Sequence, residues 1–99
     1  APVVILAYSE PSGVAASSTF PGVQNLLLSA RALGLGSVLT TLHSQVMDRV
    51  NAMFGVPAEM VFHCCIPIGY PRGNFGPTSR LPTSTTTSWD RWGKAPPWK

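Results

Sequence analysis

Side chains that could do chemistry stand at the end of a short apolar stretch, where Thr40 and Thr41 place two hydroxyls side by side. Threonine favours strands, so the pair could be purely structural, or it could offer hydrogen bonds to a bound molecule. His43 could donate a proton, but a lone histidine after a strand is more often a loop residue, because an acid or base must first meet the geometry. Arg80, taken alone, is predicted to be a solvated loop residue.

His63, Cys64 and Cys65 form a run of metal-binding residue types inside an apolar segment. Successive strand residues point to opposite faces, so these three cannot converge on one ion, and we expect no metal site. The same alternation would strain a disulfide between the two cysteines, and we expect reduced, buried thiols. Because the acidic residues are dispersed and no nucleophile and base pair is visible, the sequence gives no support for hydrolase chemistry and no catalytic side chain is assigned.

The helix that precedes these hydroxyls is predicted to be apolar on two opposite sides. At about 100° per residue, a broad arc typical of a face on a core contains Val23, Leu26, Leu27, Ala30 and Leu33. Leu28 and Ala32 lie opposite, with polar stripes between the two faces. The helix is therefore predicted to be sandwiched between its own sheet and a partner.

The ends of this helix carry capping signals. Ser18 or Thr19 can cap its start, and Pro21 suits the first turn, where a missing N–H costs little. Gly34 can take the left-handed conformation that ends a helix. A second helix, amphipathic and capped by Ser44, is predicted to end at Gly55. We expect it to bury its apolar positions, Val46, Met47, Val50, Met53 and Phe54.

Three apolar strands complete the predicted body of the chain. Residues 3–8 and 37–41 form the first two, and a right-handed crossover through the first helix makes them parallel. Residues 60–68 form the third, with Pro67 where ladder bonding should be finishing or bulged. Residues 1–76 are thus predicted to form a partial α+β domain. Residues 77–99, rich in Gly, Pro, Ser, Thr and Trp, form an extended arm whose segment 83–88 could pair with a sheet edge, either the chain's own or a partner's.

Charged residues make up only 11% of the 99 residues, against about 25% in typical soluble domains. We therefore expect another chain, or sequence absent from this one, to cover much of the surface. The chain opens on a strand without an initiator Met, which favours a fragment or a shortened gene product. The net charge of +3 is scattered, and no apolar run approaches the ~20 residues of a membrane helix, so we expect no nucleic acid, no membrane and a cytoplasmic setting.

Four strings in this order, APVVILAYS, FPGVQNLLLSARALGLGSVLTTLH, FGVPAEMVFHCCIPIGYPRGNFGP and SWDRWG, resemble the C-terminal half of the FMN-dependent nitroreductase family, especially its bacterial branch with a Trp-Asp-Arg-Trp-Gly ending. The resemblance implies a three-layer α/β/α fold of the α+β class with a mostly antiparallel sheet, in which strand 60–68 lies between the other two and runs against both. It also implies a homodimer with FMN at the subunit interface and an arm that embraces the other subunit.

By the same resemblance, Thr40 and Thr41 match the end of the strand beside the flavin ring, with Leu42 and His43 in the adjoining loop. Arg80 matches an arginine that reaches the FMN phosphate. The family's N-terminal phosphate motif and its Asn-rich middle segment have no counterpart in this sequence.

The implied activity is electron transfer from NAD(P)H through FMN to a nitro, quinone or similar small acceptor, with the protein positioning and tuning the flavin. A second copy of the chain, or a complementing N-terminal half, could supply the rest of the FMN site. The alternative is a non-catalytic remnant that acts as a dimerising interaction module.

Overall fold

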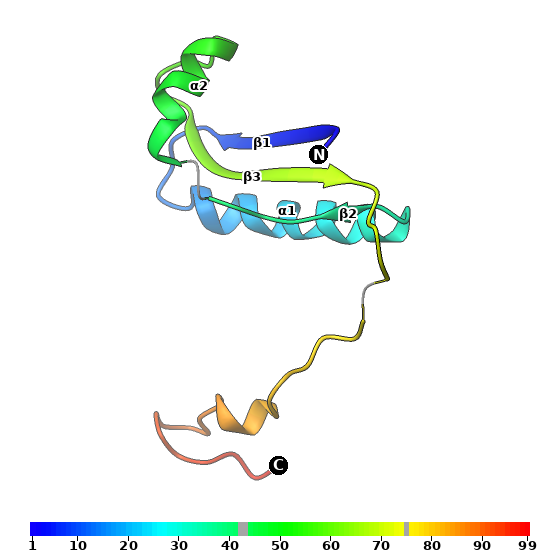
Figure 1. Ribbon diagram of the computed structural model, residues 1–99. Coiled ribbons are helices and arrows are strands. Elements are labelled where there is room, and N and C mark those ends of the chain that lie inside the picture. Colours follow the sequence, from blue (N-terminus) through cyan, green and yellow to red (C-terminus); the bar gives the residue numbers. More distant parts are fainter. Residues whose placement is uncertain (42–43, 75) are drawn as a thin grey trace.

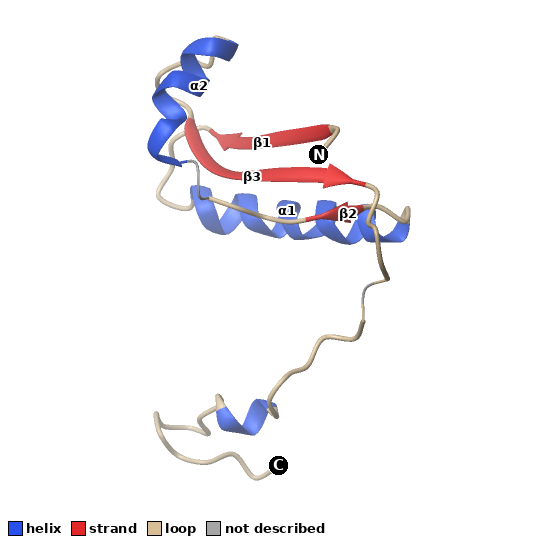
Figure 2. Ribbon diagram, viewed as in Figure 1, coloured by secondary structure: helices blue, strands red, loops and turns tan. Residues whose placement is uncertain are grey.

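The computed structural model describes residues 1–41, 44–74 and 76–99 (Figures 1 and 2). Along the chain the elements are β1 (Val3–Ser9), α1 (Ala15–Ala32), β2 (Gly36–Ser37), the 3-10 helix η1 (Ser44–Val46), α2 (Met47–Phe54), β3 (Val61–Gly69) and the 3-10 helix η2 (Thr83–Thr85). In the described part of the chain, no helix combines the length and the hydropathy needed to cross a bilayer.

The sheet has the order β1-β3-β2, and β3 runs antiparallel to both neighbours. β1 and β2 are therefore parallel to each other, as the crossover predicted, and the third strand lies in the centre, as the resemblance implied. α1 packs along one face of the sheet, and α2 sits beyond one end of the strands (Figure 1). The predicted α+β class is confirmed, with one helical layer of the three-layer arrangement supplied by the described residues.

β2 is shorter than the predicted strand because of a proline in β3. Gly36 pairs with Gly69, and the isolated bridge between Thr40 and Cys65 keeps the same register. Antiparallel pairs alternate between those that exchange two hydrogen bonds and those that exchange none. Thr40 and Cys65 exchange two hydrogen bonds, so the next hydrogen-bonded pair in this register is Val38 with Pro67. Pro67 has no N–H to donate, so one bond of that pair is missing. The segment stays in register, but its ladder is interrupted.

A β-bulge interrupts the other side of β3. Ala7 pairs with Cys64, but Tyr8 pairs with Phe62, which leaves His63 as an extra residue on β3. The ring of His63 packs edge-on against Phe20 of α1, and Cys64 also contacts the α1 side, in the core cluster. The expected alternation of faces is therefore wrong at this step, because a bulge re-aims the side chain that it inserts. β3 bends visibly at this end (Figure 1).

The core is small and lies between α1 and one face of the sheet. Its buried centre consists of Val23 from α1 and Cys64 and Ile66 from β3. The partly buried residues packed around it are Ile5, Ala7, Phe20, Leu26, Leu27 and Ile68. Both cysteines are buried and free, which confirms the expected reduced thiols.

α1 begins earlier than predicted and has no side-chain cap. Its N-cap is Val14, so the proposed caps Ser18 and Thr19 are wrong, and Pro21 lies inside the helix instead of in its first turn. Alanines and serines before Pro21 extend the helix without contributing to the apolar pattern. Gly34 has φ +79°, which confirms the predicted left-handed stop.

The two predicted faces of α1 are unequally covered. Val23 and Ala30 are buried, but Leu33 is 78% exposed, so its assignment to the core face is wrong; it is the C-cap residue, where the helix leaves the sheet. On the opposite side Leu28 is 58% exposed and Ala32 is exposed too. This second apolar face is therefore uncovered within the chain.

α2 touches the sheet through few residues. Met47 is buried, but Met53 and Phe54 are 74% and 66% exposed, so their predicted core positions are wrong. The helix follows η1, with Val46 as N-cap in place of the predicted Ser44, and ends at Gly55, whose φ of 66° confirms the predicted stop. The hydroxyl of Tyr8 donates to Asn51 Oδ1 at 2.6 Å and ties α2 to the end of β1.

Beyond residue 76 the chain runs away from the sheet (Figure 1). The rings of Trp89 and Trp98 meet edge to face at 5.5 Å, and the amide of Gly93 donates to Ser88 Oγ, so the end of the arm closes on itself. Residues 83–85 form η2, so the expected strand pairing with the chain's own sheet is wrong: threonine hydroxyls bond locally to carbonyls one turn back. The division at residues 76 and 77 stays a prediction.

Candidate functional site

Thr40 is fixed to the centre of the sheet by its backbone. Its N–H donates to the Cys65 carbonyl at 2.9 Å, and its carbonyl accepts from the Cys65 N–H at 2.8 Å. Thr41 follows and is exposed. Leu42 and His43, the other two predicted loop residues, lie outside the described residues. The strand thus holds one hydroxyl residue rigidly and presents the next one at the point where the ladder ends.

The face on which Thr40 lies follows from its partner. Directly paired residues of antiparallel strands share a face, and neighbours along a strand alternate. Cys64 belongs to the α1 cluster, so Cys65 and Thr40 lie on the face of the sheet away from α1. Among the described residues, no helix covers the part of that face around Val4 and Val38, whose side chains are more than half exposed. Val38, two residues before Thr40 on this face, thus presents an exposed apolar side chain next to the strand end.

Polar side chains also meet at the α2 end of the sheet, around the bulge. Ser9 Oγ lies 2.7 Å from His63 Nε2, and Tyr8 bonds to Asn51. The tautomer of His63 decides which atom donates in the first pair. Sequence reasoning missed both pairs, because their members are 54 and 43 residues apart and nothing local marks them.

Arg80 is not brought next to Thr40 within one chain. It lies in the arm, between the segment that still touches the body and η2, and its side chain is exposed. Gly76, just before the arm, and Thr78 of the arm line a hollow of about 270 Å³ with Leu27 and Arg31 of α1. If Arg80 and Thr40 serve one site, the chain must associate or the arm must move.

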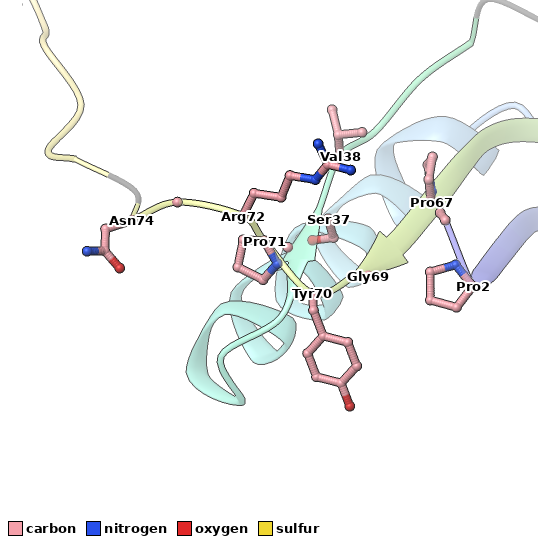
Figure 3. Close-up of a pocket in the computed structure, with 12 residues that line it drawn as sticks. Pro2, Ser37, Val38, Pro67, Gly69, Tyr70, Pro71, Arg72 and Asn74 are labelled. Carbon is pink, nitrogen blue, oxygen red and sulfur yellow. The ribbon is translucent and has the colours of Figure 1, made fainter.

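Another hollow lies at the other end of the sheet, and sequence reasoning did not anticipate it (Figure 3). It encloses about 560 Å³ between the start of β1, residues 36–38 and the segment after β3. Pro2, Val38 and Pro67 form apolar walls, and Arg72 also lines the hollow, whereas Tyr70 points away from the sheet. Thr40, Thr41 and Arg80 do not line it, so it is separate from the predicted site.

The surroundings of Cys64 favour its neutral thiol. Burial, and secondarily the neighbouring Cys65, raises the pKa of the Cys64 thiol above its ordinary value of 9.0. Cys64 is therefore held as the neutral thiol at neutral pH. Across residues 1–41, 44–74 and 76–99, no three His, Cys, Asp or Glu side chains come together in a way that could hold a metal ion.

Known proteins resemble this chain in sequence and in fold. Residues 1–70 match the sequence model of the nitroreductase family. Over 56 residues the chain is 41% identical to a protein of Methanothermobacter thermautotrophicus that is provisionally named NADH dehydrogenase/NAD(P)H nitroreductase. That alignment covers 54% of this chain and 29% of the relative.

A solved structure has the same arrangement of elements. It is a Bacteroides thetaiotaomicron protein with the same provisional name, and it superposes with a TM-score of 0.77 at 24% identity. The superposition covers 90% of this chain and 55% of that structure. The chain thus spans about half the length of this structural relative, and the likeness establishes the fold.

Proposed function

This chain belongs to the nitroreductase family, and on that premise we propose that it supplies part of an FMN site in an NAD(P)H-dependent oxidoreductase acting on small electron-poor molecules such as nitro compounds or quinones. The observation that carries the proposal is the family match over residues 1–70 together with the fixed position of Thr40 in the matched segment. FMN, when bound, supplies the capacity to accept hydride from one molecule and pass electrons to another.

The donor set at the strand end suits the polar edge of a flavin. Backbone pairing with Cys65 fixes the position of Thr40, and Thr41 would present its hydroxyl and peptide groups where the ladder ends. Such preset groups bind and orient a ring at little cost in conformational entropy. Arg80 would hold the phosphate as a bidentate partner, and Leu42 and His43 would border the same edge.

Association supplies the rest of the site in this proposal. The exposed apolar side of α1, at Leu28 and Ala32, would pack against a second copy, and residues 77–99 would lie across it. The arm carries Trp92, which is 99% exposed, and the large exposed apolar residue Leu81. Buried aromatic anchors of this type dominate the energy of many interfaces. The Arg80 of one copy would then approach the strand end of the other.

The alternative is a non-catalytic dimerising module, and one observation favours it. Arg80 and Thr40 do not meet within the chain, so the apolar surfaces could associate without forming a flavin site. Both functions predict a dimer, and only the first predicts a flavin.

Absorbance distinguishes the two. Purified chain is mixed with FMN and passed through a desalting column, and the protein fraction is scanned for the oxidised-flavin band before and after NADPH is added. A retained band that bleaches with NADPH supports the oxidoreductase. A colourless dimer supports the interaction module.

A further inference from the structure

We propose that His63 is a positioning residue for the strand end that carries Thr40. From the β-bulge, His63 fixes the register of the stretch of β3 that pairs with Thr40. This inference deepens the proposed function and rests on it for its meaning, since the strand end matters because of the flavin. His63 itself would not touch the flavin.

His63 is the extra residue of the bulge, and strand pairing alone does not determine which residue of β3 takes that place. One extra residue on β3 separates the pair Ala7 with Cys64 from the pair Tyr8 with Phe62. A bulge loosens the ladder and bends the strand, and such features occur frequently beside active sites, where they redirect a side chain. Without an anchor, the insertion could move along β3, and Cys65 would change its register with its neighbours.

Two contacts anchor the inserted residue. Ser9 Oγ lies 2.7 Å from His63 Nε2, and the Phe20 ring meets the imidazole edge to face with centroids 5.7 Å apart. The first contact comes from the end of β1, and the second comes from α1. His63 therefore joins the three elements that meet at this end of the core, and leucine or valine could make only one of the two contacts.

Thr40 is linked to His63 through Cys64 and Cys65 of β3. Cys65, whose N–H and carbonyl both bond to Thr40, follows His63 after a single intervening residue. Two residues further along β3, Pro67 removes the next bond of the same ladder. The Thr40 bridge thus stands between a missing bond on one side and the bulge on the other, and its geometry depends on the bulge being held.

Amide hydrogen exchange of the full chain tests, without any flavin, whether the contacts of His63 stabilise the pairing of Thr40 with Cys65. In the ¹⁵N-labelled chain, exchange of the Thr40 and Cys65 amides is compared with that of Ile66, which pairs with Ile5 in the core. His63→Phe removes the hydrogen bond to Ser9 but keeps an aromatic ring, whereas Ser9→Ala removes that bond together with the 3.1 Å bond from Ser9 Oγ to the Glu10 carbonyl. We expect each to speed exchange at Thr40 relative to Ile66 on the order of five- to tenfold, the effect of losing one side-chain hydrogen bond.

Two further variants make the outcome decisive. His63→Gln keeps a hydrogen-bonding group for Ser9 and should return the Thr40 to Ile66 ratio to within about twofold of the unchanged chain. Ser37→Ala removes a hydroxyl from the strand that carries Thr40 but is remote from the bulge, and should leave the ratio unchanged. A Thr40 to Ile66 exchange ratio that stays constant in Ser9→Ala and His63→Phe overturns the proposal. An equal rise of this ratio in Ser37→Ala also overturns it. Uniform acceleration of all amides would mean that His63 only stabilises the whole chain, and this result overturns the proposal too.

Flavin binding is read separately on the same samples, by quenching of FMN fluorescence. Failure of the unchanged chain to quench FMN would count against the proposed function and would leave the exchange result to stand or fall alone.

Discussion

Thr40 and Cys65 exchange two backbone hydrogen bonds, at 2.9 and 2.8 Å, in a register that continues from Gly36 and Gly69 across a gap in the ladder. The gap lies at Pro67, which faces the same neighbouring strand as Cys65 but has no N–H. The structure thus treats residues 36–40 as one extended segment with a bond missing from its middle.

Replacing that proline should close the ladder. Pro67→Val supplies a β-favouring residue whose N–H can donate to the carbonyl of Val38. We expect the new amide to be protected from hydrogen exchange and the Thr40 amide to exchange several-fold more slowly, on the order of one added hydrogen bond. Pro71→Val, beyond the end of β3, is the control and should not slow Thr40. An unprotected amide at position 67 would mean that the two strands are not in register there.

Two glycines should respond oppositely to alanine. Gly55 ends α2 with φ +66°, so Gly55→Ala should destabilise the chain by about 1–2 kcal/mol through backbone strain alone, because a Cβ would meet nothing within 4 Å. Gly22 lies inside α1, also with open space around it, so Gly22→Ala should stabilise by roughly 0.5–1 kcal/mol. Urea unfolding followed by circular dichroism measures both changes. Equal effects of the two substitutions would contradict the assigned helix boundaries.

The core should be sensitive where it is thin. Ile66 is fully buried at the centre of β3, and Ile66→Ala should cost about 2–5 kcal/mol from lost burial and a residual cavity. Leu33→Ala removes a similar volume from a residue that is 78% exposed and should change stability by no more than about 0.5 kcal/mol in the isolated chain. Thermal unfolding compares the two. A large loss from Leu33→Ala would place that side chain in contact with a partner.

The Cys64 thiol should make stability fall in alkali. Its pKa is raised in the folded chain by burial and by Cys65, so the unfolded thiol ionises first, near its ordinary value of 9.0. The contribution is complete below that pH and is lost as the pH rises toward the folded pKa, with a slope of up to about 1.4 kcal/mol per pH unit. Cys64→Ser should be less stable at neutral pH but show a shallower decline above pH 9. Parallel curves for the two proteins would refute the assignment.

Local chemistry made part of this fold predictable. Gly34 and Gly55 were marked as helix ends because only glycine takes a left-handed backbone freely, and both have positive φ. The crossover rule gave the parallel relation of β1 and β2, and the resemblance gave the central place of β3. The apolar pattern at Leu28 indicated a second face, and that face is exposed.

Features that depend on contacts between residues far apart in the chain could not be predicted from the local sequence. The bulge at His63 arises from how β1 and β3 align, and the Ser9 and His63 contact follows from the bulge. The early start of α1 was missed because residues 15–19 carry no apolar period and no cap, although they tolerate a helix. Leu33 and Met53 have the right spacing for a core, but they stand where their helices leave the body.

Site residues divide in the same way. Thr40 could be placed at a strand end from its own segment, whereas the position of Arg80 depends on where the arm docks, and this information is not in the local sequence.

Sedimentation velocity of the chain with added FMN, recorded at 280 nm and at the flavin band near 450 nm, shows whether association and flavin binding occur together. Flavin absorbance should move with the protein in a particle of at least twice the 10.5 kDa chain mass. A boundary at the mass of a single chain, with the flavin left behind in solution, would contradict this prediction.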